Sequence, residues 1–129
     1  FERSKFDIYF ETDQQEKGFV EVKGMTLENQ GIGAFPDAPT IRGLKHVQEL
    51  RVAQALDYHC YVLFIVQFSA IQAATLHRLM QPALYQAAEM AMADGVQILA
   101  YNCEVDQESI SIKESVSFDL KQEFIDPNQ

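Results

Sequence analysis

The chain has 129 residues, of which 47% are hydrophobic and 22% charged, and its formal net charge is −9 at pH 7. This length and apolar fraction suit one domain with a sizeable core and exclude a disordered chain. The negative charge argues against a stand-alone nucleic-acid binder, because such proteins carry a basic face that offsets phosphate charge. Strong nucleic-acid affinity would therefore reside elsewhere in the protein, or would need a metal ion in an acidic pocket.

The sequence shows no signal peptide, and its longest apolar run, 61–66, has only the length of a strand. Cys60 and Cys103 lie in apolar runs without the clustered spacing of a metal site, so we expect reduced core thiols in a cytoplasmic protein. A disulfide stays open, because the sequence does not show whether their strands are neighbours. The chain begins at Phe1 as if inside a structural element, so we expect a part of a longer protein.

The first part of the chain predicts a β-hairpin and a long loop. Residues 5–11 and 19–27 have strand patterns, and the polar stretch 12–18 between them predicts the turn. Residues 28–43 contain three glycines and two prolines, which predicts a loop, and so long a loop in one domain is more often functional than idle. Thr40 is a candidate N-cap for the helix that follows.

The middle of the chain predicts two helices around a central strand. Apolar residues recur at helical spacing through 44–56. The run 61–68 is almost wholly apolar, which is typical of a central strand covered on both faces. The second helix is predicted at 83–93, with Pro82 at its start and Gly95 at its end.

Strands are then predicted at 96–105 and 109–113, where they alternate and can pair, and residues 121–129 have the composition of a frayed end. The order is strand, strand, long loop, helix, strand, helix, strand, strand. This order predicts an α/β fold with a mixed β-sheet flanked by helices.

Three residues of the predicted hairpin carry the chemistry. Glu21 and Lys23 are two apart on one strand, so their side chains point the same way. An antiparallel partner strand could place Asp7 beside Glu21. Two adjacent carboxylates repel each other unless a cation lies between them, and Mg²⁺ takes one or two carboxylates together with water and phosphate oxygens. Lys23 would then position the attacking water or stabilise charge on a phosphate.

A plainer interpretation of the same residues also stays open. Glu-x-Lys is common, and on a half-buried strand it often forms a surface ion pair that adds little stability. The succession of Asp7 and then Glu21-x-Lys23 on consecutive strands favours the metal site over that alternative, but the pattern is weak by itself.

Several blocks together resemble one bacterial family, the sugar fermentation stimulation proteins. These blocks are residues 4–7 (SKFD), 19–27 (FVEVKGMTL), 35–40 (FPDAPT), 42–43 (RG), 45–46 (KH), 49–50 (EL) and 95–101 (GVQILAY). Between residues 67 and 81 the chain departs from the family pattern, because apolar residues replace a more polar stretch. We expect His59 and His77 to be plain surface residues.

The resemblance implies a two-part protein. Residues 1–129 would form its single C-terminal domain, similar to PD-(D/E)xK nucleases and so restriction-endonuclease-like, and an OB-like N-terminal domain would lie outside this chain. Asp7, Glu21 and Lys23 match the catalytic positions of that superfamily, with Asp7 and Glu21 as ligands of Mg²⁺ or Mn²⁺. A further acidic residue is expected just upstream. DNA would be the partner, bound mainly by the N-terminal domain, and no membrane is implied.

The loop and helix start supply four further candidates. Asp37, Arg42, Lys45 and His46 could reach phosphate or metal, and a helix N-terminus favours an anion nearby. The alternative is ordinary loop chemistry, in which Asp37 caps a turn and His46 packs.

Two functions remain open at this stage. The first is a DNA-binding protein with a Mg²⁺-dependent nuclease-type site. The second is a non-catalytic DNA-binding regulator of sugar, particularly maltose, metabolism on a nuclease scaffold. An interaction module with an acidic surface is a third possibility that no motif supports.

Overall fold

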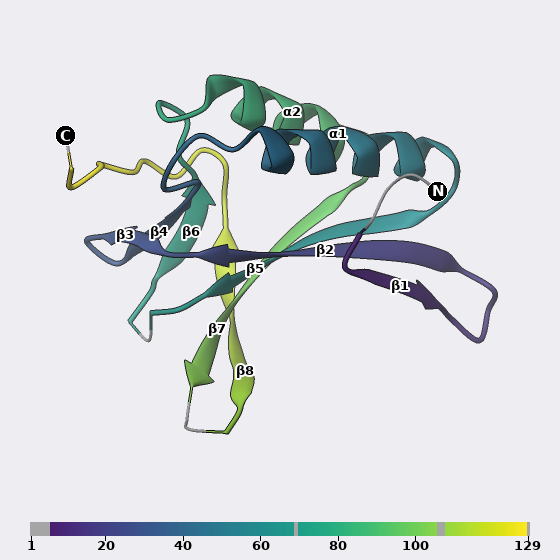
Figure 1. Cartoon of the computed structure of the whole chain (residues 1–129), viewed down its shortest axis with the longest axis horizontal. Coiled ribbons are helices and arrows are strands. Elements are labelled where there is room, and N and C mark those ends of the chain that lie inside the picture. Colours follow the sequence, from purple (N-terminus) through teal and green to yellow (C-terminus); the bar gives the residue numbers. More distant parts are fainter. Residues whose placement is uncertain (1–5, 69, 106–107, 129) are drawn as a thin grey trace.

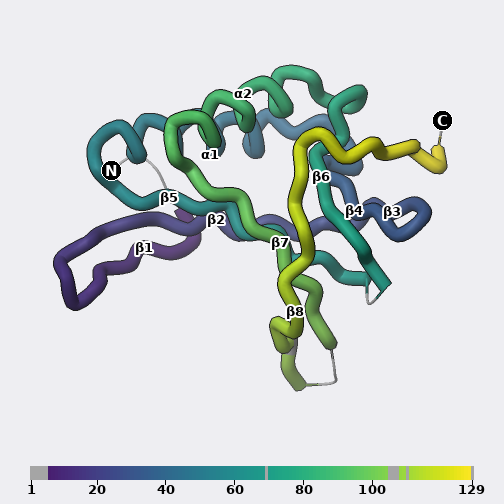
Figure 2. Tube along the Cα trace, turned by 180° about the vertical axis from the view of Figure 1, so that it is seen from behind, coloured from purple at the N-terminus to yellow at the C-terminus, as the bar shows by residue number. Residues whose placement is uncertain are grey.

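The computed structural model describes residues 6–68, 70–105 and 108–128, and all structural statements below concern these ranges. Within them, eight strands form one mixed sheet in the order β1-β2-β5-β7-β8-β6-β4-β3. Figure 1 shows both helices on the same side of this sheet, and the view from behind in Figure 2 agrees. The predicted α/β fold with a mixed sheet is confirmed.

The elements follow one another as β1 (Ile8–Glu11), β2 (Lys17–Met25), β3 (Leu27–Asn29), β4 (Ile32–Phe35), α1 (Ile41–Ala55), β5 (His59–Val66), β6 (Ala73–Leu76), α2 (Pro82–Ala93), β7 (Gln97–Val105) and β8 (Ile110–Phe118).

The predicted hairpin is present, since β1 and β2 pair antiparallel with Ile8 opposite Val20. β2 then pairs in parallel with β5, and β5 with β7, so parallel strands form the middle of the sheet. Buried and half-buried residues alternate along β5, and the buried ones, such as Val62 and Phe64, join the core. β5 is therefore central as predicted, but only one of its faces is fully covered.

Both helices begin where the sequence predicts. Thr40 has extended backbone geometry, and its hydroxyl accepts a hydrogen bond of 2.9 Å from the backbone N–H of Gly43, which satisfies a free donor of the first turn. The predicted apolar spacing of α1 is borne out by its buried Val47 and Leu50. Pro82 is the first residue of α2, where its missing N–H costs nothing.

The prediction of a loop at 28–43 is wrong, and a strand within 67–81 was not predicted. The stretch 28–43 contains part of β3 and all of β4, which pair antiparallel around a turn at Gly31, where φ is +83°. β6 lies within 67–81 and pairs in parallel with β4. These strands have only three or four residues, which is too short for a period of two to stand out from the sequence.

The C-terminal segment is also held more firmly than its composition predicts. Asp126 is buried, and its Oδ2 lies 2.8 Å from Nε2 of His77, which is buried as well. Asn29 donates a 2.7 Å hydrogen bond to the carbonyl of Ile125. The expectation of a frayed end is therefore wrong, and so is that of a surface position for His77, whereas His59 is exposed as expected.

The two cysteines are free thiols, so they form no disulfide even though β5 and β7 are neighbours. Cys60 is buried, which raises the pKa of its thiol to about 11 and keeps it unreactive, while Cys103 is only partly covered. Among the described residues, neither helix has the length and apolar character needed to cross a membrane.

Candidate active site

Glu21 and Lys23 lie on β2, where the parallel strand β5 pairs with them and holds their backbone. The alternation of the strand turns both side chains toward the helix layer. Glu21 is only 2% exposed, and together with Lys23 and His46 it lines a small space walled by apolar residues of α1, α2 and the sheet. A carboxylate in such surroundings is costly, which marks this position as more than a surface ion pair.

Asp7 meets the same strand from just before β1. Its Oδ2 accepts a hydrogen bond of 2.8 Å from the backbone N–H of Val22. Its carboxyl group also hydrogen-bonds with that of Glu21, which is the main reason why the pKa of Asp7 lies below its ordinary value. The expected placement of Asp7 beside Glu21 is therefore observed, and Asp7 itself is exposed to solvent.

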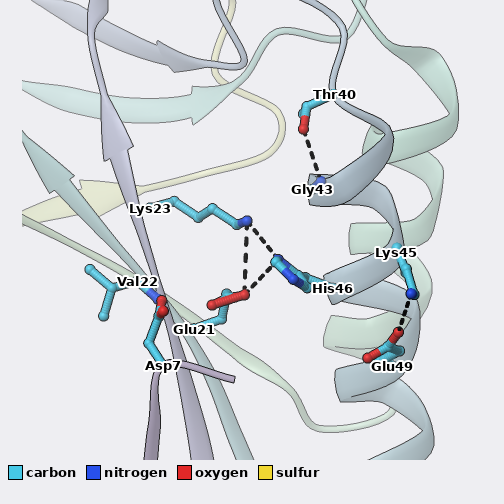
Figure 3. Close-up of polar contacts among 9 residues, drawn as sticks. All are labelled: Asp7, Glu21, Val22, Lys23, Thr40, Gly43, Lys45, His46 and Glu49. Carbon is cyan, nitrogen blue, oxygen red and sulfur yellow. Dashed lines mark hydrogen bonds and ion pairs between the residues drawn. The ribbon is translucent and has the colours of Figure 1, made fainter. Parts of the chain in front are cut away.

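His46 completes the group from the neighbouring helix α1. Figure 3 shows its ring pointing at both residues of β2. Its Nδ1 lies 2.8 Å from Nζ of Lys23 and 2.6 Å from Oε2 of Glu21, and Nζ lies 3.9 Å from the same Oε2. Nδ1 of His46 accepts from Lys23 in one tautomer of the ring and donates to Glu21 in the other.

One carboxylate oxygen of Glu21, Oε2, lacks a hydrogen-bond donor in this arrangement. In the tautomer in which Nδ1 of His46 accepts from Lys23, it has no proton to donate to Oε2 of Glu21. That oxygen is buried and has no hydrogen-bond partner among the described residues. A buried acceptor without a donor is unfavourable, and it indicates a place for a missing proton, water or cation.

The titration behaviour follows from the same geometry. Burial, together with the hydrogen bond to Asp7, raises the pKa of Glu21 to about 7, against the opposing charges of Lys23 and Arg42. Burial likewise lowers the pKa values of Lys23 and of His46, since it disfavours their charged forms. Glu21 therefore titrates close to neutral pH, where most carboxylates are fully ionised.

The residues present fit a divalent cation that prefers oxygen ligands. Asp7 and Glu21 offer adjacent carboxylates, and Oε2 of Glu21 lacks a partner. Mg²⁺ is commonly held by one or two carboxylates, with water and phosphate filling the other positions. The described ranges contain no group of three or more His, Cys, Asp or Glu residues arranged around a metal position, so this pair would be the whole protein contribution within them.

The other predicted residues divide into two sets. Arg42, exposed on the first turn of α1, is close enough for its charge to lower the pKa values of Lys23 and His46. Lys45 instead pairs with Glu49 along the helix at 3.7 Å, as Figure 3 shows. Asp37 accepts a hydrogen bond of 3.3 Å from the hydroxyl of Thr26. The structure therefore joins His46 and Arg42 to the site but gives Lys45 and Asp37 other partners.

The contact between His46 and Lys23 was not predicted, although one signal for it exists in the sequence. The buried stripe of α1 contains Gly43, Val47 and Leu50. His46 lies three residues after Gly43 and next to Val47, so helical periodicity turns its side chain toward the sheet.

Comparison with known proteins places the chain in a family. Residues 1–109 match the model described as "Sugar fermentation stimulation protein RE domain". The sugar fermentation stimulation protein homolog of Enterococcus mundtii is 56% identical over 128 residues, which cover 99% of this chain and 53% of that protein. The homolog of Alkaliphilus oremlandii is 42% identical over 124 residues, 94% of this chain and 53% of that protein.

A solved structure shows the same fold. It is titled "The structure of Pyrococcus Furiosus SfsA in complex with Ca2+", and it superposes with a TM-score of 0.83 at 21% identity, covering 92% of this chain and 51% of the other. The chain spans about half the length of the curated relatives it matches. On the family model and the identity to these relatives, the chain belongs to the sugar fermentation stimulation protein family.

Proposed function

We propose that this domain binds Mg²⁺ or Mn²⁺ through Asp7 and Glu21 and hydrolyses phosphodiester bonds in DNA, in the manner of PD-(D/E)xK nucleases. One observation carries the proposal. Two adjacent carboxylates and a lysine converge at a point where a buried carboxylate oxygen, Oε2 of Glu21, has no hydrogen-bond partner among the described residues. A purely structural ion pair gains nothing from leaving that oxygen unsatisfied.

Each residue has a distinct part in this proposal. Asp7 and Glu21 hold the cation, which when bound supplies positive charge against the charge that builds up on the phosphate. Lys23 donates a hydrogen bond to the attacking water or to a phosphate oxygen. His46 is a positioning residue, because its Nδ1 accepts from Nζ of Lys23 and directs the ammonium group toward Glu21.

Two further facts support a metal-dependent role. The Pyrococcus furiosus relative is described in complex with Ca²⁺, which shares with Mg²⁺ a preference for oxygen ligands. The net charge of −9 implies that this domain does not hold DNA strongly by itself. We propose that most DNA affinity comes from an OB-like N-terminal domain, in keeping with relatives about twice as long as this chain.

Calorimetric titration with Mg²⁺ and Mn²⁺ tests the cation site. The wild-type chain is expected to bind, while Glu21→Gln and Asp7→Asn lose at least about tenfold in affinity. Glu104→Gln is the matched control, because this carboxylate lies on β7 and pairs with Lys113 instead. Absence of binding, or binding that survives Glu21→Gln unchanged, would contradict the metal assignment.

Cleavage assays with duplex and single-stranded DNA test the chemistry. Lys23→Ala is expected to abolish cleavage while leaving calorimetric metal binding within a few-fold of wild type, since Lys23 is not a ligand. The full-length Enterococcus mundtii homolog serves as a parallel enzyme for the screen. If neither protein cleaves any DNA form in Mg²⁺ or Mn²⁺, the hydrolytic proposal is wrong.

The alternative function is a non-catalytic DNA-binding regulator of sugar, particularly maltose, metabolism. One observation favours it, namely that within the described ranges no three metal-binding side chains gather around one position. This alternative predicts salt-dependent DNA binding by the full-length homolog without cleavage.

A further inference from the structure

A second concave feature lies outside the candidate active site, where α2 begins and the C-terminal segment passes. Figure 2 shows this segment crossing beside the end of β6 and the start of α2. The cavity there has a volume of about 390 Å³, and its lining includes Arg78, Tyr85, Lys121, Glu123 and Phe124. This volume is within the range of ligand-binding pockets.

The charges around this cavity include two basic side chains that lie outside the ion pairs of this acidic protein. Other basic side chains, such as Arg51 and Lys113, form ion pairs with carboxylates. Arg78 and Lys121 both line the cavity, and within the described ranges neither has a carboxylate partner. Glu123 is the lone carboxylate of the lining, so the cavity has a net positive charge. In a chain of net charge −9, two cations without carboxylate partners at one cavity favour an anionic ligand.

The walls of the cavity are fixed before any ligand arrives. The guanidinium carbon of Arg78 lies 4.9 Å from the ring centroid of Tyr85. The hydroxyl of Tyr85 donates a hydrogen bond of 2.8 Å to the carbonyl of Leu120, next to Lys121. The buried contact between His77 and Asp126 anchors the same two segments. Groups held in place lose little entropy on binding, so the arrangement is preorganised.

The cavity and the candidate active site have one wall residue in common. Leu76 contributes to the walls of both. The starts of the two helices are joined by a pair of hydrogen bonds, from the N–H of Thr40 to Oε1 of Gln81 at 2.8 Å and from Nε2 of Gln81 to the carbonyl of Thr40 at 2.9 Å. Arg42 follows Thr40 by two residues and lies on the first turn of α1.

We propose that this cavity binds a backbone phosphate of the nucleic-acid strand whose neighbouring phosphodiester lies at Glu21 and Lys23. Arg78 and Lys121 are the residues that hold the phosphate. The inference rests on the proposed function, and it adds where the strand runs: past Arg42 and into the cavity. Repeated backbone phosphates suit two cationic positions joined by a common wall.

NMR titration of the 129-residue chain with a short DNA oligonucleotide tests this path, because it detects weak affinities. Arg78→Gln and Lys121→Gln are each expected to weaken DNA binding about fivefold. Each should also reduce the slope of log affinity against log salt concentration by about the amount that one phosphate contact contributes. Both side chains are exposed, so the variants should fold, which circular dichroism checks. Lys113→Gln is the matched control, because it removes the same charge from a lysine paired with Glu104, and should stay within about twofold of wild type.

The outcomes separate this inference from the proposed function. If the wild-type chain binds DNA and both variants match Lys113→Gln, the path is wrong and the proposed function stands. If the wild-type chain binds no DNA, the path is wrong, and the cleavage assays alone decide the proposed function. A parallel titration with inorganic pyrophosphate tests whether the cavity prefers a free phosphate compound to a nucleic acid. Chemical-shift changes at Arg78 and Lys121 with pyrophosphate but not with DNA would overturn the nucleic-acid assignment. Chemical-shift changes with both ligands support it.

Discussion

Replacing Glu21 by glutamine should stabilise the metal-free domain above neutral pH. Glu21 is 2% exposed, and burial raises its pKa from an ordinary value of 4.5 to about 7. At about 1.4 kcal/mol per pH unit, this shift means that ionised Glu21 costs the folded state about 3 kcal/mol. Glutamine keeps the shape and the hydrogen-bonding capacity but carries no charge.

The direction of the pH dependence follows from the raised pKa. The stability that protonated Glu21 contributes is complete below about pH 4.5, and it is lost as the pH rises through about 7. The groups that face Glu21 are Asp7, Lys23, His46 and Arg42. The lowered pKa of His46 acts in the opposite direction below its ordinary value of 6.5, so only the difference between wild type and variant isolates Glu21.

Urea unfolding of both proteins in a chelator, from about pH 4.5 to about pH 8, measures that difference. The Glu21→Gln variant should equal wild type at the acid end and exceed it by about 3 kcal/mol at the alkaline end. With Mg²⁺ at a hundred times its dissociation constant from wild type, wild type should regain about 2.7 kcal/mol and the variant at most about 1.4 kcal/mol. A difference below about 1 kcal/mol at every pH, or equal stabilisation of both proteins by Mg²⁺, would refute the reasoning.

Three further predictions concern stability, each measured by urea unfolding. A methyl group added at Gly18 would lie 2.0 Å from the carbonyl oxygen of His59, so Gly18→Ala should cost about 3 kcal/mol, whereas Gly24→Ala, with its nearest neighbour 3.8 Å away, should be neutral or better; equal effects would be contrary to the packing described. His77→Ala should lower stability because it leaves Asp126 without its partner, while His59→Ala at the exposed site should change stability by less than about 0.5 kcal/mol, and equal effects would mean that the pair of His77 and Asp126 contributes little. Thr40→Ala should cost about 1 kcal/mol through loss of the helix cap and Thr40→Ser much less, so similar losses would rule out the capping hydrogen bond.

The sequence by itself determined the elements whose signals are local. The spacing in α1 predicted a helix, because one face of a helix repeats every three to four residues. Thr40 and Pro82 predicted helix starts, because the unpaired donors of a first turn favour them. The short strands β3, β4 and β6 gave no such signal, since three or four residues are stabilised by their partners in the sheet rather than by their own pattern.

The candidate site divides in the same way. Asp7, Glu21 and Lys23 belong to one hairpin, where the turn and the alternation of strands place side chains together, so their proximity was predictable from the sequence. His46 is 23 residues from Lys23, and Asp126 is 49 from His77. Such contacts depend on the order of strands in the sheet and on where the helices pack across it. That order is decided by burial of the whole core and not by neighbouring residues, so only the tertiary structure showed the imidazole beside Lys23 and the anchored C-terminal segment.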